Sequence, residues 1–177
     1  NLTPPEPGSV LLKFPVPGDE YAPPTTGHLD NTCGHSLNTI TILDEILPRG
    51  GGFTVWPGSH MMCHEYFRHH DVREPLNGGQ LPWRYGTGVE FTGAPGDVCY
   101  IHPWMIHTVG HNVRDTLRMV AQIGFFRRTL KEDYDHIPDD LWWFWEGMQR
   151  IESTMRAKDR EWHIERGEDS MPNGLTY

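Results

Sequence analysis

The chain has 177 residues, of which 15 are Lys or Arg and 24 are Asp or Glu, so its formal charge is −9 with histidine neutral. This length suits one domain with a substantial core. An acidic chain repels phosphate, which argues against nucleic acid and anionic membranes as partners. No apolar stretch reaches the roughly 18 residues of a membrane-spanning helix. We therefore expect one soluble domain over residues 1–177.

The cysteines indicate the compartment. Only Cys33, Cys63 and Cys99 are present, an odd number without C-x-x-C spacing. This pattern argues against a disulfide framework or a zinc knuckle, and it favours a cytoplasmic location. Because the sequence does not begin with Met, we also expect that part of the N-terminal region is missing from it.

As far as residue 126, the chain contains short segments whose residue types alternate with a period of two, as on the two faces of a strand. Turns with Gly and Pro separate these segments. We predict strands at residues 9–14, 37–43, 53–56, 89–92, 97–102, 105–109 and 116–126. The turn residues at 48–52 favour a hairpin between the second and third of these. About eight strands with tight turns are typical of an all-β core, a double-stranded β-helix (jelly roll, cupin-like) spanning about residues 9–128.

Two other segments lack this alternation. Residues 61–88 carry histidines and aromatic side chains without a clean period, and a loop of this length is usually functional or partly helical. The C-terminal segment, about residues 137–165, begins with Pro138, a residue favoured in the first helical turn. Its apolar residues recur at helical spacing: Leu141, Trp142, Trp145, Met148 and Ile151. We predict an amphipathic C-terminal helix packed on a sheet.

Three residues form a candidate metal site. His28 and Asp30 stand two apart, so on a strand both side chains project from the same face. H-x-D alone is common, but His107 on a later predicted strand supplies a second imidazole. Two histidines and one carboxylate are the facial triad of non-heme Fe(II) oxygenases, which leaves coordination positions open for substrate and dioxygen.

Arg118 is a candidate anion-binding residue. It follows His107 by eleven residues and shares one face of its predicted strand with Val120 and Gln122. A guanidinium inside the barrel requires an anion, and its strand offers no obvious partner. A dicarboxylic cosubstrate would pair with it in bidentate fashion.

Several motifs together resemble the phytanoyl-CoA dioxygenase family of Fe(II)- and 2-oxoglutarate-dependent oxygenases. The similarity covers about residues 25–127. It is carried by the sequence Gly27-His28-Leu29-Asp30, the strand 38–44 leading to Trp56-Pro57-Gly58-Ser59-His60, the turn Pro95-Gly96-Asp97-Val98 with His102, and the spacing from His107 to Arg118.

This resemblance implies a function and a set of site residues. Iron would be held by His28, Asp30 and His107, and Arg118 would pair with the distal carboxylate of 2-oxoglutarate. A polar residue on the strand after H-x-D often helps to hold the cosubstrate, and Thr39 and Thr41 are the candidates. With dioxygen, and with ascorbate as an accessory reductant, such an enzyme would hydroxylate an unactivated C–H bond of a small, mostly apolar molecule, releasing succinate and CO2.

Two alternatives remain open. Gly96, Pro103, His107 and Asn112 roughly match a second cupin motif, which would fit a cupin-like metalloenzyme that uses no 2-oxoglutarate. The first cupin motif does not fit, because it has H-x-H where this chain has H-x-D. A non-catalytic jelly roll that binds a small ligand is the other alternative, and it leaves Arg118 unexplained.

Two further histidines, His60 and His102, lie in the motifs that carry the resemblance. His60, in the Pro-Gly-Ser-His sequence, is interpreted as a structural turn residue. His102 lies near the end of its predicted strand, where it could contact a substrate or support a metal ligand.

Overall fold

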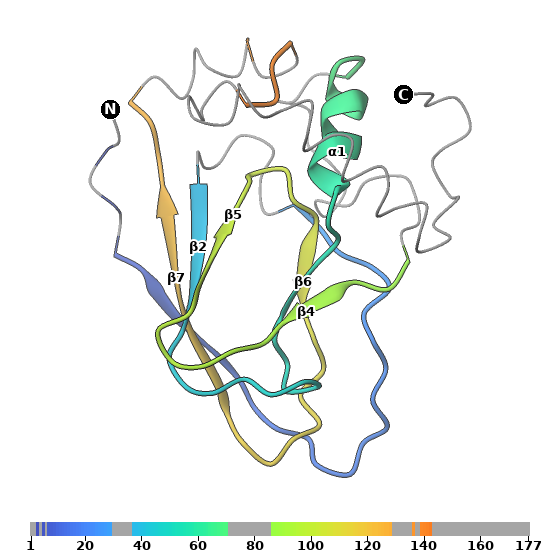
Figure 1. Cartoon of the computed structure of the whole chain (residues 1–177), viewed down its shortest axis with the longest axis vertical. Helices are drawn as coiled ribbons and strands as arrows, with labels where there is room; N and C mark the ends of the chain where they lie inside the picture. The colour runs from blue at the N-terminus through green and yellow to red at the C-terminus, as the bar shows by residue number, and fades with distance from the viewer. Residues whose placement is uncertain are drawn as a thin grey trace.

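The computed structural model of the chain describes residues 3, 5, 7–29, 37–70, 86–128, 136 and 139–142. Within these ranges it has seven strands and one helix (Figure 1). In chain order they are β1 (Ser9–Lys13), β2 (Leu37–Ile42), β3 (Phe53–Val55), α1 (Ser59–Phe67), β4 (Val89–Phe91), β5 (Val98–Ile101), β6 (His107–Val109) and β7 (Arg118–Phe125).

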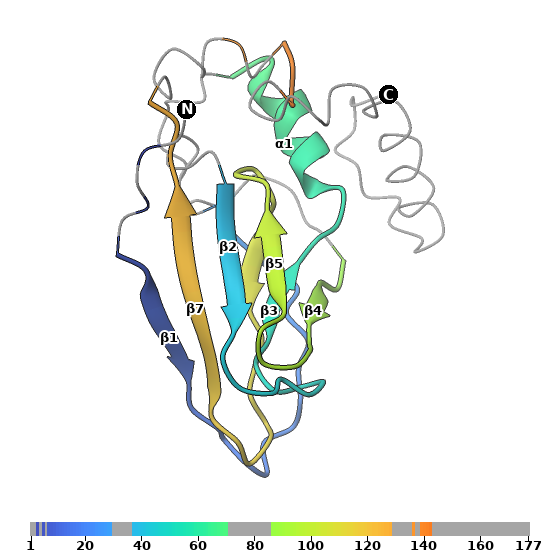
Figure 2. The ribbon, with the colours of Figure 1, turned by 60° about the vertical axis from the view of Figure 1, so that its left-hand side comes forward.

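The strands form two antiparallel sheets. One has the order β1-β7-β2-β5 and the other β4-β3-β6. Figure 2 shows the strands of the larger sheet side by side. Each strand falls inside a segment that the period-two alternation predicted, so the all-β core is confirmed. The more specific assignment to a double-stranded β-helix remains a prediction.

The predicted hairpin between residues 37–43 and 53–56 is wrong. β2 pairs with β5 and β7, whereas β3 pairs with β4 and β6, so the connection crosses from one sheet to the other. The connection is also not a tight turn, because it forms bridges of its own, Ile46 with Gly93 and Gly50 with Asn112. The sequence Pro-Arg-Gly-Gly-Gly at residues 48–52 marks a change of direction but does not tell which strand the chain pairs with afterwards.

The core lies between the two sheets. Ile40 and Ile42 of β2 and Val120 of β7 are at most 1% exposed, and they pack with Phe53 of β3. Ile46 and Ile101 complete this cluster. The alternation in β2 therefore places its isoleucines inside.

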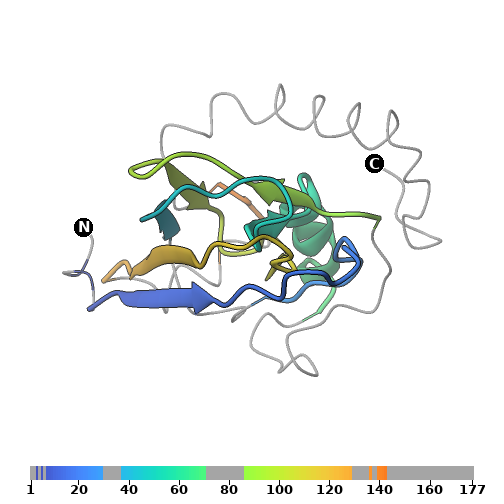
Figure 3. The same cartoon turned by 90° about the horizontal axis from the view of Figure 1, so that it is seen from below.

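The larger sheet has an unusually apolar outer face. Strand register places one set of alternate residues on that face: Val10, Leu12, Leu37, Thr39, Thr41, Val98, Tyr100, Met119, Ala121, Ile123 and Phe125. None is charged, although an outward sheet face is commonly polar. Val10 is 61% exposed on β1, which forms one edge of the sheet beside β7 (Figure 3), and Tyr100 is 67% exposed on β5.

Helix α1 corrects one interpretation and confirms another. His60 is a helix residue rather than a turn residue, while the expectation that 61–88 is partly helical is confirmed as far as residue 67. Gly58 precedes the helix with φ of 84°, a conformation that favours glycine. In the part of the chain that is described, no helix is long and apolar enough to cross a membrane. Except for residues 139–142, the predicted C-terminal helix lies outside the described residues.

Candidate functional site

His28 and His107 are directly opposite each other in an isolated antiparallel bridge. The amide of His28 donates to the carbonyl of His107 at 2.9 Å, and the amide of His107 donates to the carbonyl of His28 at 3.1 Å. Side chains of such a pair project from the same face. Their ring centroids are 4.8 Å apart, so two imidazoles distant in sequence are neighbours in space.

A hydrogen bond fixes which nitrogen of His107 can bind a metal. Its Nδ1 lies 2.9 Å from the carbonyl oxygen of Met105. A carbonyl only accepts, so Nδ1 carries the proton, and in the neutral ring Nε2 then holds the lone pair. Metal-binding histidines commonly have this arrangement, in which one nitrogen donates to a carbonyl and the other is the ligand.

Gly27 allows the segment that carries His28 to approach β6 and Trp56 closely. A Cβ atom at this position would lie 2.8 Å from Cγ2 of Ile106 and 2.9 Å from the carbonyl oxygen of His107, and would also collide with the ring of Trp56. No side chain fits there. The glycine that precedes the H-x-D pair is therefore required for the bridge between His28 and His107.

Ser59, at the start of α1, holds the backbone just before His107. Its side chain is buried, its Oγ accepts the amide hydrogen of Ile106 at 2.9 Å, and it lies 3.3 Å from Sδ of Met105. Since the carbonyl of Met105 orients His107, the Pro-Gly-Ser-His sequence contributes to the position of the imidazole through its serine.

Replacing Ser59 with alanine should destabilise the fold by about 1–3 kcal/mol, because the buried amide of Ile106 loses its acceptor. Urea denaturation measures this change in the free energy of unfolding. Thr108→Ala is the matched control, because Thr108 is a half-buried hydroxyl residue on β6, and its substitution should change stability by at most about 0.5 kcal/mol. Equal losses in the two variants would contradict this role of Ser59.

Arg118 is 3% exposed, at the start of β7, on the same face as the core residue Val120. Its Nε and Nη2 are buried and have no hydrogen-bond partner in the described part of the protein. Burial also lowers the pKa of Arg118, which reflects the cost of a desolvated guanidinium. The expectation that this arginine faces inward is confirmed, and an anion as its partner stays a prediction.

Thr39 and Thr41 lie on the face of β2 opposite to Ile40. Because Arg118 is on the core side of the sheet together with Ile40, both threonines face away from it. The hydroxyl of Thr39 donates to the carbonyl of Ile123 on the neighbouring strand at 3.2 Å. The structure thus does not bring either threonine together with Arg118. The polar residue that β2 directs inward is Asn38.

Asn38 is 6% exposed and was not identified from the sequence as a site residue. Its Oδ1 is buried without a hydrogen-bond partner among the described residues. The alternation of β2 contained the signal, because Asn38 is the polar residue in register with Ile40 and Ile42.

The third predicted metal ligand, Asp30, lies outside the described residues. Among the residues that are described, no group of three or more His, Cys, Asp or Glu side chains could hold a metal ion. The structure therefore brings together His28 and His107, and the position of the carboxylate remains a prediction.

His102 belongs to a second group of buried rings, at the end of β5. Its Nδ1 accepts the amide hydrogen of Trp104 at 3.1 Å, and its Nε2 donates to the carbonyl of Leu141 at 3.2 Å. The rings of His60 and Trp142 lie 5.7 and 5.2 Å from that of His102. These contacts give His102 a structural role, since it attaches residues 139–142 to the end of β5.

The free energy of unfolding should fall as the pH is lowered from about 6.5 to 4. Desolvation by burial lowers the pKa of His102 to about 4, the charge of His64 adds to this effect, and the bond to Leu141 opposes it. The unfolded chain, with a histidine pKa near 6.5, binds a proton in this interval that the folded chain does not. This difference lowers the free energy of unfolding by about 3 kcal/mol.

Chemical denaturation at several pH values measures this dependence in the wild type and in His102→Gln, which cannot titrate at this position. The comparison of slopes separates His102 from the other histidines. The same slope in both proteins would contradict the low pKa of His102.

Comparison with known proteins gave structural similarities only. No family model matches the chain, and no curated protein matches it. The chain is similar to the crystal structure of EvdMO1, with 22% identity, a TM-score of 0.48, and coverage of 72% of this chain and 28% of that one. It is also similar to AviO1 from Streptomyces viridochromogenes Tue57, with 21% identity, a TM-score of 0.47, and coverage of 70% and 51%.

A third similar structure is SnoN, described as a non-heme alpha-ketoglutarate-dependent epimerase from nogalamycin biosynthesis. It has 23% identity, a TM-score of 0.45, and coverage of 68% of this chain and 45% of that one. The chain thus spans about half the length of these proteins or less. At TM-scores below 0.5, these similarities do not indicate which reaction this chain catalyses.

Proposed function

We propose that this chain is part of an Fe(II)- and 2-oxoglutarate-dependent oxygenase with a double-stranded β-helix core, as the resemblance to the phytanoyl-CoA dioxygenase family implies. The enzyme oxidises, by hydroxylation, an unactivated C–H bond of a small, mostly apolar molecule. The observation that carries the proposal is a pair of adjacent imidazoles, His28 and His107, in a β-fold that also buries Nε and Nη2 of Arg118 without a hydrogen-bond partner among the described residues.

The residues of the chain fit a ferrous ion. His28 and His107 supply two neighbouring nitrogens, and the bond from Nδ1 of His107 to Met105 favours the tautomer that a metal requires. Asp30, two residues after His28, is the third ligand in this proposal. When bound, iron supplies the dioxygen chemistry that no protein side chain provides.

The residues also fit 2-oxoglutarate. A carboxylate that accepts from Nε and Nη2 of Arg118 would satisfy both buried donors at once, in the geometry that a guanidinium favours. For the second polar contact, the geometry favours Asn38 over Thr39 and Thr41, because Asn38 lies on the inner face of β2.

The remaining contribution of the chain is to position these groups and to exclude water. Trp56 and Trp104 are at most 2% exposed and lie in the segments that flank α1 and β6. The ring of Trp56 lies directly beside Gly27, which precedes His28, so this buried side chain helps to hold that part of the site in place.

The test is turnover of 2-oxoglutarate without a prime substrate. Purified protein with Fe(II), ascorbate and dioxygen should form succinate, detected by proton NMR, and should bind 2-oxoglutarate anaerobically in calorimetry. Absence of both would end the proposal. Tight iron binding without any binding of 2-oxoglutarate would favour the cupin-like metalloenzyme instead.

A further inference from the structure

Asn112, between β6 and β7, lies outside the proposed site, and its carboxamide makes three hydrogen bonds. It is 0% exposed. Its Nδ2 donates to the carbonyl of Lys13 at 3.0 Å and to that of Thr116 at 2.9 Å, and its Oδ1 accepts the amide hydrogen of Arg114 at 3.1 Å. Two carbonyls and one amide allow only this orientation of the carboxamide.

These contacts hold two backbone segments next to Arg118, one before it in the chain and one on the neighbouring strand. Thr116 lies two residues before Arg118, and Lys13 is the residue of β1 that pairs with Arg118 in the sheet. The carboxamide of Asn112 therefore fixes the turn that leads into β7 to the end of the strand beside it.

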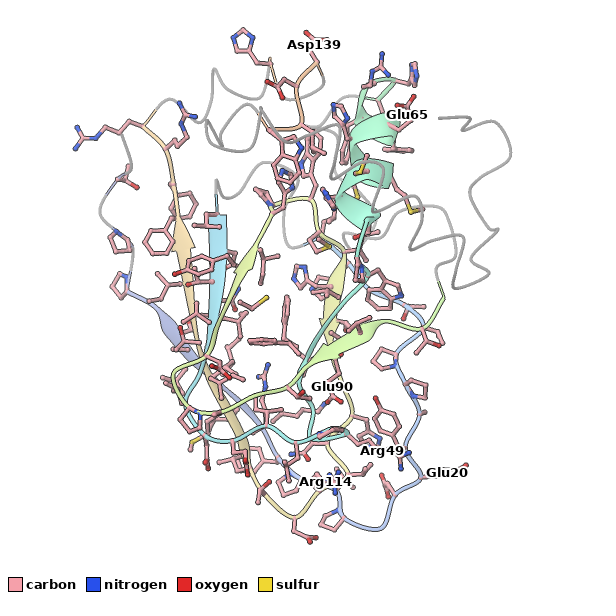
Figure 4. All side chains as sticks on the ribbon, in the orientation of Figure 1. Glu20, Arg49, Glu65, Glu90, Arg114 and Asp139 are labelled. Atoms are coloured by element: carbon pink, nitrogen blue, oxygen red, sulfur yellow. The ribbon has the colours of Figure 1, made fainter. Side chains whose placement is uncertain are left out.

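The backbone of Asn112 connects the same turn to two other segments. Its carbonyl accepts the amide hydrogen of Val16 at 2.9 Å, and it bridges to Gly50. The amide of Val113 donates to the carbonyl of Arg49 at 3.1 Å. Arg114 and Arg49, labelled in Figure 4, lie at the same lower end of the molecule. Asn112 thus stands where the turn meets β1 and the connection between the sheets.

We propose that Asn112 is a positioning residue that sets the reach of Arg118 into the barrel and thereby the length of dicarboxylate that the site accepts. This inference rests on the proposed function. The guanidinium is a planar fork at the end of a long side chain, and bidentate pairing depends on where the Cα of that side chain is held. A shift at residue 118 would change the distance between the metal ligands and the fork.

The experiment compares Asn112→Ala with Arg114→Ala in the full chain, with Fe(II), in the absence of oxygen. Arg114→Ala is the matched control, because it removes an exposed side chain from the same turn, with its bond from Nε to the carbonyl of Pro48, and leaves the side-chain bonds of Asn112 in place. Calorimetry measures the affinities for Fe(II), for 2-oxoglutarate and for 2-oxoadipate, which is one methylene longer.

In Asn112→Ala, the Kd for 2-oxoglutarate should rise about tenfold or more, and the preference for 2-oxoglutarate over 2-oxoadipate should change by at least about threefold. The affinity for Fe(II) should stay within about twofold, and Arg114→Ala should resemble the wild type. Simple loss of folded protein would weaken both dicarboxylates equally, so an unchanged preference would overturn the inference.

A second measurement uses the wild type, in case Asn112→Ala does not fold. Binding at Arg118 should stabilise the turn that positions it, so 2-oxoglutarate with Fe(II) should slow hydrogen exchange of the Arg114 amide, which donates to Asn112. Unchanged exchange at this amide would overturn the inference.

The inference and the proposed function fail in different ways. If the wild type binds no 2-oxoglutarate, both fail. If the wild type binds it, Arg118→Met does not, and Asn112→Ala keeps the affinity and preference of the wild type, then only the role of Asn112 fails.

Discussion

Replacing Arg118 with methionine should weaken 2-oxoglutarate binding at least about 30-fold, because a buried charge pair loses one partner at a cost of about 2 kcal/mol or more. The same substitution should stabilise the ligand-free protein by about 1–4 kcal/mol. Arg118 is 3% exposed and two of its nitrogens have no hydrogen-bond partner among the described residues, so an apolar side chain removes that desolvation cost.

These opposite effects distinguish a binding residue from a structural one. Thermal denaturation with and without 2-oxoglutarate measures both, since the wild type should gain stability from the ligand and the variant should not. Arg114→Met changes the net charge equally at an exposed position and is the control. If Arg118→Met destabilised the ligand-free protein and left the affinity for 2-oxoglutarate intact, Arg118 would instead be a structural residue.

Replacing His107 with alanine should lower the affinity for Fe(II) by more than about 100-fold and abolish succinate formation. Loss of a residue that merely supports a metal ligand already costs about 10- to 100-fold, and His107 is proposed as a ligand itself. His28→Ala should have a similar effect, because the two imidazoles are neighbours at 4.8 Å.

His111→Ala is the matched control for these variants. His111 lies four residues after His107, and its ring nitrogen is 3.6 Å from a carboxylate oxygen of Asp19. In His111→Ala, the affinity for Fe(II), measured by titration, and the rate of succinate formation, measured in the turnover assay, should be close to those of the wild type. Wild-type iron affinity in His107→Ala would exclude the proposed metal centre.

The strands could be predicted from the sequence because a half-buried strand shows its two faces as a period of two. In β2, Ile40 and Ile42 alternate with Thr39 and Thr41, and the structure places the isoleucines in the core. The same alternation places Asn38 inside. The prediction of Thr39 and Thr41 rests on residue type and not on the face of the strand, and therefore does not include the inward amide of Asn38.

The pairing of strands could not be predicted in the same way. Turn residues show where the chain reverses, but β2 and β3 are assigned to different sheets by packing across the core, which leaves no local pattern. The position of helix α1 could not be predicted either. Buried residues, among them His60 and Cys63, lie all around this helix, so its sequence has no amphipathic period. Arg118 was predictable as an inward residue, since its strand places it in step with Val120.

The eleven uncharged side chains on the outer face of the larger sheet affect the solubility of the polypeptide. Val10 and Leu12 on the edge strand β1 are 61% and 48% exposed, and Tyr100 on β5, the opposite edge strand, is 67% exposed, so both edges of the sheet present apolar side chains to solvent. Surfaces of this kind adhere to one another and to edge strands of neighbouring molecules. Concentrated samples of residues 1–177 should therefore self-associate, and light scattering that rises with protein concentration and falls on addition of a mild detergent would reveal it.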